Sequence, residues 1–216
     1  MRTAYSIILR VLSTLVLVLF IVSAGLAGYK SHPWTPRPKE AYPAQLTSEG
    51  ITIAVDPLLL DSLASQVFDK GDIVTRGIMP LGVVIFNENA FPVSIDSGTI
   101  EIIQGDDHLH SLPPGEAVHE IFKGGRNILS PSSMPKATLN PDALSDFEHK
   151  SLEKKTVAAH GKGGGFLYLR IPSKDVRGYL ANSRVYIPDV WRTDNSTKLI
   201  FFEIELKPAV DAISGN

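Results

Sequence analysis

Apolar and polar residues alternate with a period of two along much of the chain, a pattern typical of β-strands that bury one face. Segment 198–206 shows this pattern most fully, and one of its faces is apolar throughout: Ile200, Phe202, Ile204 and Leu206. The opposite face starts apolar and becomes polar toward its end: Leu199, Phe201, Glu203 and Glu205. Six further segments are predicted as strands: 51–55, 80–87, 92–104, 156–159, 165–171 and 184–190.

The predicted strands, about seven in all, fall into an early and a late group. Turn signals separate them, such as the pair Asp194-Asn195 before the last strand. Short strands with frequent turns are typical of two antiparallel sheets that pack face to face. The pattern therefore predicts a mainly β fold, an antiparallel β-sandwich that covers residues 50–208.

Three segments are predicted as short helical insertions in this sandwich. The leucines of residues 57–68 share one helical face, with Pro57 at the first helical position, and we expect them to pack onto a sheet. Residues 111–122 are opened by a Pro-Pro pair, and Asn140 before a proline is typical of another helix start. Residues 123–139, between these two helices, are rich in Gly, Ser and Pro and are predicted to be irregular.

The N-terminal segment 1–29 has an uncharged run over residues 11–29. Its length is close to the roughly 20 residues that cross a bilayer as a helix, and it exceeds the core of an ordinary signal peptide. Two interpretations stay open. Small residues at Ala24 and Ala27 suit a cleavage site, whereas an uncleaved anchor is favoured by flanking residues that suit the headgroup level: Tyr29, Lys30 and Trp34. The anchor interpretation predicts a membrane helix over about residues 11–27, and either interpretation predicts an exported domain.

Residues 30–49 hold four prolines and show no apolar period. Because proline fixes φ and removes a backbone donor, this composition favours an extended, semi-rigid tether. The predicted order is thus the N-terminal anchor or signal segment, a proline-rich tether, the sandwich, and a C-terminal tail over residues 209–216.

The stretch NENAFPVSI interrupts two predicted strands at residues 87–95. Asparagine tolerates left-handed backbone and bonds its own turn, and Pro92 suits the beginning of a strand, so we expect a corner between antiparallel strands. We expect Phe91 to fold back over the end of the sandwich. If this side chain is exposed instead, the loop becomes a candidate partner-binding surface, made of Asn87, Asn89 and Phe91.

This corner resembles the Asn-Pro-Asn-Pro-Phe-Pro corner of the water-stress domain of late-embryogenesis-abundant proteins, which is an immunoglobulin-like β-sandwich. The likeness is carried by Asn87, Asn89, Phe91 and Pro92, while Glu88 and Ala90 stand where that pattern has proline. The whole layout also resembles uncharacterised exported bacterial proteins: a membrane segment, a proline tether, and strands such as PLGVVIFN, GFLYLRIP and LIFFEIEL. These resemblances imply an immunoglobulin-like sandwich and no particular activity.

Composition removes several classes of function. The chain has no cysteine, which excludes disulfides, thiolate catalysis, Cys-ligated zinc and lipid attachment through an N-terminal cysteine. Its formal net charge of -2 gives no electrostatic reason to expect nucleic acid.

Two tracts are candidate chemical sites. His108 and His110, next to two aspartates in residues 106–110, would share one face of a strand and could hold a divalent metal, but Gly105 favours a polar turn there. The run HGKGGG at residues 160–165 lacks the spacing of a phosphate loop and is predicted as a flexible hairpin connection. No serine lies in a nucleophile elbow. We therefore predict no catalytic, cofactor-binding or metal-ligating residues and no enzyme.

The sequence leaves three hypotheses. The first is a non-catalytic, membrane-tethered sandwich module, periplasmic or at the cell surface, that binds a protein or envelope component. The second is a sandwich that binds a lipid or small ligand in an apolar cavity between its sheets. The third is a metal-dependent hydrolase that uses the histidine tract. A cleaved signal would make the same domain a secreted protein.

Overall fold

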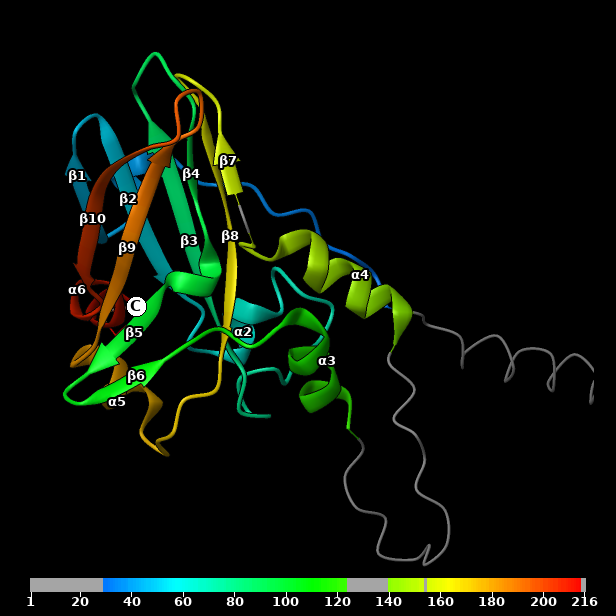
Figure 1. The fold of residues 1–216 in the computed structure, drawn as a ribbon. Coiled ribbons are helices and arrows are strands. Elements are labelled where there is room, and N and C mark those ends of the chain that lie inside the picture. The colour runs from blue at the N-terminus through cyan, green and yellow to red at the C-terminus, as the bar shows by residue number, and fades with distance from the viewer. Residues whose placement is uncertain (1–28, 124–139, 154, 215–216) are drawn as a thin grey trace, which may run out of the picture.

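A computed structural model of the chain describes residues 29–123, 140–153 and 155–214 (Figure 1). In this part of the chain two antiparallel sheets pack face to face. The first sheet has four strands in the order β1-β2-β3-β8. Their bounds are Ala44–Ser48 for β1, Ile51–Pro57 for β2, Met79–Asn87 for β3 and Lys162–Leu169 for β8.

The second sheet has six strands in the order β6-β5-β9-β4-β7, and β10 pairs with the other edge of β9. Their bounds are Val93–Ile95 for β4, Glu101–Gln104 for β5, Asp107–Leu109 for β6, Lys155–Val157 for β7, Arg184–Arg192 for β9 and Thr197–Glu205 for β10. The predicted mainly β, two-sheet architecture is confirmed.

The main core lies between the sheets and follows the alternation in the sequence. Every second residue of a central strand points inward, so that Val83 and Leu167 of the first sheet meet Ile187 and Phe202 of the second, all fully buried. Burying an apolar side chain of this size stabilises the fold by about 1.5–3 kcal/mol. The intersheet space is therefore filled with side chains.

The outer face of the first sheet is covered by a helical layer (Figure 1). Its helices are α2 Asp61–Ala64, α3 Pro114–Phe122 and α4 Pro141–Lys150. Aromatic rings fill the space between this layer and the sheet: Phe68 lies 4.5 Å from Phe147, and Phe147 lies 5.0 Å from Tyr168, measured between ring centroids. The strand β8 thus serves two cores, one on each face.

The helices α3 and α4 confirm two of the predicted insertions. Asn140 caps α4, since its side-chain oxygen accepts hydrogen bonds from the backbone N–H groups of Asp142 and Ala143. The prediction of a helix over residues 57–68 is wrong for most of its length, because Pro57 is the last residue of β2 and only four residues of α2 are helical. Residues 124–139, most of the segment predicted to be irregular, lie outside the described residues.

Two further expectations are corrected. The predicted strand over residues 92–104 is two strands, β4 and β5, because Asp96 accepts a hydrogen bond from the backbone of Gly98 and turns the chain. The HGKGGG run is mostly strand rather than a hairpin connection, because Gly163–Gly165 pair with β3. A Cβ at Gly164 would lie 2.3 Å from a β3 carbonyl oxygen, so the close approach of the two backbones requires glycine.

The predicted C-terminal tail largely lies in a helix, α6 Lys207–Ser214, whose Val210 is buried in the main core. A short helix, α5 Val176–Ala181, packs beside it. Among the described residues, no helix has the length and apolar character that crossing a membrane requires. The predicted span over residues 11–27 lies outside them.

Candidate ligand-binding cleft

Residues 29–43, here called the strap, run across the outer face of the first sheet before the chain enters β1 (Figure 1). Tyr42 is only 2% exposed, and the Trp34 ring lies 4.8 Å from the ring of Phe166 on β8. Ala44 then pairs with Val55 on β2. The extended, semi-rigid tether predicted over residues 30–49 therefore lies against the domain: aromatic side chains of the strap pack there, and Ala44–Ser48 form β1.

Helix α4 carries a buried ion pair under the strap. Asp146 and Lys150 lie one turn apart, and their side chains are 1% and 4% exposed. The ammonium of Lys150 lies 2.6 Å from one carboxylate oxygen of Asp146 and donates a hydrogen bond of 2.7 Å to the backbone carbonyl of Val67. Because each charge has the other as partner, the pair can stay ionised away from water.

Two strap hydroxyls complete this network. Tyr29 donates a hydrogen bond of 2.6 Å to one carboxylate oxygen of Asp146, and Ser31 donates to the other. Burial, together with the Asp146 carboxylate, raises the pKa of Tyr29 well above its usual range. Burial lowers the pKa of Lys150, an effect that Asp146 opposes. Tyr29 and Ser31 of the strap are thus fastened to α4 through the Asp146 carboxylate, which Lys150 neutralises.

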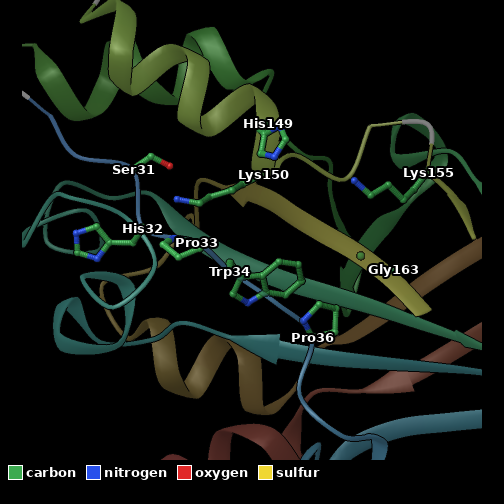
Figure 2. Close-up of a pocket in the computed structure, with 10 residues that line it drawn as sticks. Ser31, His32, Pro33, Trp34, Pro36, His149, Lys150, Lys155 and Gly163 are labelled. Carbon is green, nitrogen blue, oxygen red and sulfur yellow. The ribbon is translucent and has the colours of Figure 1, made fainter. Parts of the chain in front are cut away.

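A cleft of about 500 Å³ lies between the strap, the end of α4 and the neighbouring strands β7 and β8 (Figure 2). Its ten lining residues include two lysines, two histidines and a tryptophan, and none of them carries a carboxylate. The charged and aromatic ones are Lys150, Lys155, His32, His149 and Trp34. Figure 2 shows the ammonium end of Lys155 turned toward the side of the cleft where His149 lies.

A second recess of about 380 Å³ lies on the other side of Ser31 and His149. Asp142 and Asp146 also line this second recess, which makes it acidic, whereas the first cleft is basic. Sequence reasoning missed both. The four-residue spacing of Asp146 and Lys150 indicates an ion pair on one helix, but the sequence does not show that the strap lies over it.

The corner at residues 87–95 connects β3 to β4 and carries the chain from one sheet to the other. The Asn87 side chain is 2% exposed; it donates to the carbonyls of Phe91 and Ala158 at 2.8 and 3.0 Å and accepts from the Asn89 N–H. Asn89 in turn donates to the carbonyl of Glu49, in the turn between β1 and β2.

Phe91 is half-buried at this end of the sandwich. It packs against the main core, and the guanidinium carbon of Arg192 lies 4.1 Å from its ring centroid. The structure therefore brings together the three predicted partner-binding residues, but it uses both asparagine side chains to hold the corner. Binding through Asn87, Asn89 and Phe91 stays a prediction.

The histidine tract forms the hairpin of β5 and β6, with its turn at Gly105 and Asp106. A ring nitrogen of His108 lies 2.7 Å from a carboxylate oxygen of Glu101, and His110 lies 3.9 Å from the other. Within the described residues, no group of three or more His, Asp or Glu side chains is arranged to hold a metal ion.

Comparisons with known proteins add little to this geometry. No family model and no curated protein matches the chain. A solved structure from Bacillus subtilis subsp. subtilis, described as "a putative lipoprotein (ycdA)", is similar over 76% of this chain and 38% of that one. The identity is 11% and the TM-score 0.37, a likeness too low to identify a shared fold.

Proposed function

We propose that this chain is a membrane-tethered, extracytoplasmic β-sandwich module, periplasmic or at the cell surface, that binds a protein or another envelope component without catalysis. The observation that carries the proposal is the docked strap. Tyr29 ends the uncharged N-terminal run and is hydrogen-bonded to Asp146 on α4. A membrane helix ending near Ala27 therefore has no free linker between itself and the domain.

The docked strap sets how far the cleft lies from the membrane. Ser31 is four residues beyond Ala27. Four extended residues span at most roughly 14 Å. The cleft thus opens close to the headgroup level in the tethered state, which suits recognition of a component at the membrane surface. If the N-terminal segment is cleaved as a signal, the same cleft belongs to a secreted protein.

A second candidate, a module for a small ligand or lipid, is favoured by the cleft itself. The sequence hypothesis placed the ligand between the sheets, where the core side chains are fully buried and fill the space. The cleft under the strap offers a solvent-facing alternative.

The immunoglobulin-like class is our finer proposal for the sandwich. Two facing antiparallel sheets and the asparagine-held corner support it. The described sheets of four and six strands exceed the seven strands of a constant-type immunoglobulin domain, so the likeness concerns the packing of the sheets and not the strand count.

Photo-crosslinking in intact bacterial cells tests the binding proposal. Benzoylphenylalanine replaces His149, at the rim of the cleft, or Ser196, in the exposed turn between β9 and β10. After illumination, the full chain is purified from membranes and its adducts are identified by mass spectrometry. We expect a specific adduct from position 149 and none from position 196. The absence of adducts at both positions would contradict a binding module that acts through this face.

A further inference from the structure

The basic cleft under the strap holds a positive charge that the fold does not neutralise. Lys150 is paired with Asp146, so it adds little net field. Lys155, on β7, also lines the cleft, and among the described residues no carboxylate lies within ion-pair distance of it. A lysine without a partner at the wall of a concave site attracts anions.

A second lysine strengthens this field from β8. Lys162 donates a hydrogen bond of 3.1 Å to the carbonyl of Pro36, a strap residue that lines the cleft. Within the described part of the chain it too has no carboxylate partner. Lys155 and Lys162 therefore place two unneutralised charges beside one cleft, on a chain whose formal net charge is -2.

The remaining walls suit a compact anion with an attached organic part. His149 offers a ring nitrogen at one side, whereas the Ser31 hydroxyl already donates to Asp146. Trp34 offers a half-buried ring, and Gly163 and Gly164 leave that part of the wall without side chains (Figure 2). An aromatic ring and exposed backbone can pack against an organic group, whereas the ammonium groups donate hydrogen bonds to the anion itself.

We propose that this cleft binds a phosphate group, with the Lys155 ammonium and His149 as its direct contacts and Lys162 adding to the attraction. The phosphate is either that of an anionic lipid headgroup or a free phosphate ion. The lipid source rests on the proposed membrane tether, which brings Ser31 within about 14 Å of the end of the membrane helix. The phosphate chemistry itself does not depend on the tether.

The two tryptophans of the chain allow a direct test. Trp191→Phe leaves Trp34, at the cleft, as the only tryptophan. The full chain with this change, in dodecyl maltoside micelles, is titrated with inorganic phosphate against chloride at constant ionic strength. It is then titrated with dihexanoyl phosphatidylglycerol against dihexanoyl phosphatidylcholine. Equilibrium dialysis measures binding, and Trp34 emission locates it.

We expect saturable binding of phosphate or phosphatidylglycerol, with a Kd at least tenfold higher after Lys155→Ala. Lys174→Ala is the matched control, because Lys174 is an exposed lysine in the loop after β8. Phosphatidylglycerol binding at least tenfold more tightly than inorganic phosphate identifies the lipid source; equal affinities identify free phosphate.

Two results would overturn the proposal: no saturable binding of either anion, or equal affinity in the Lys155→Ala and Lys174→Ala proteins. Either result leaves the broader binding proposal standing if position 149 still forms an adduct in cells. Phosphate binding without such an adduct contradicts only the broader proposal.

Discussion

Replacing Lys150 with methionine should destabilise the protein far more than a surface lysine substitution does. Methionine keeps most of the length and apolar stem of the side chain but removes the charge. Asp146 is 1% exposed; it would keep hydrogen bonds from Tyr29 and Ser31 but lose the one cation that pairs with it among the described residues. The carbonyl of Val67 would lose its donor as well.

The expected loss follows from these contacts. Breaking a buried ion pair by removing one partner costs about 3–5 kcal/mol, because the remaining charge stays buried and uncompensated. That is at least about a fifth of the roughly 5–15 kcal/mol by which a domain is stable. For a chain of this size, the melting temperature should fall by about 6–20 °C.

Helix α6 provides a matched control. Lys207 and Asp211 also form a lysine–aspartate pair four residues apart, at 2.6 Å, but their side chains are 64% and 58% exposed. An exposed pair of this kind contributes less than about 1 kcal/mol. Lys207→Met should therefore leave the melting temperature nearly unchanged. Both variants are compared with the unsubstituted full chain by circular dichroism during heating.

The double variant Asp146→Leu with Lys150→Met should recover much of the loss, because it removes both buried charges together. Two outcomes would refute the reasoning. If Lys150→Met costs no more than Lys207→Met, the pair is open to water and the strap is not closed over it. If the double variant is worse than Lys150→Met alone, the cost does not come from an uncompensated carboxylate.

Four further predictions follow from the corner, the glycine run and the histidine hairpin. Asn87→Ala should lower stability by about 2–3 kcal/mol in urea denaturation, because buried carbonyls lose their donor. Phe91→Ala should cost about 2 kcal/mol, less than a fully buried ring, and an unchanged urea midpoint would instead favour the exposed, partner-binding interpretation. Gly164→Ala should prevent or severely weaken folding, seen as loss of soluble expression, since its Cβ would lie 2.3 Å from a carbonyl oxygen of β3. Replacing His108 and His110 together with alanine should change neither melting temperature nor metal content by elemental analysis; a stoichiometric metal lost in that variant would revive the hydrolase hypothesis.

The strands could be predicted because their alternation directly reflects which face is buried. Phe202 and Ile204 point inward and Phe201 and Glu203 outward, as the sequence pattern indicates. The helix over residues 57–68 could not be excluded locally, because its leucines have helical spacing but pack into different cores. Leu59 belongs to the intersheet core and Leu58 to the helical layer.

The cleft could not be predicted, because its parts are far apart in the sequence. The proline content of the strap predicts a spacer. The burial of Tyr42 and the half-burial of Trp34 depend on the surface of the first sheet, which the local sequence does not reveal. The bond from Tyr29 to Asp146 joins residues 117 positions apart. The glycines of β8 carry no side-chain alternation that would predict a strand. They are needed because the backbone of β3 approaches them closely.

Cysteine labelling in cells tests the tethered, extracytoplasmic arrangement most directly, since the chain has no cysteine of its own. Ser196→Cys places a thiol in the exposed turn between β9 and β10, and Ser6→Cys places one before the predicted span. A membrane-impermeant maleimide added to intact spheroplasts should label position 196 at once and position 6 only after lysis. Labelling of position 196 only after lysis would place the sandwich in the cytoplasm and contradict the account.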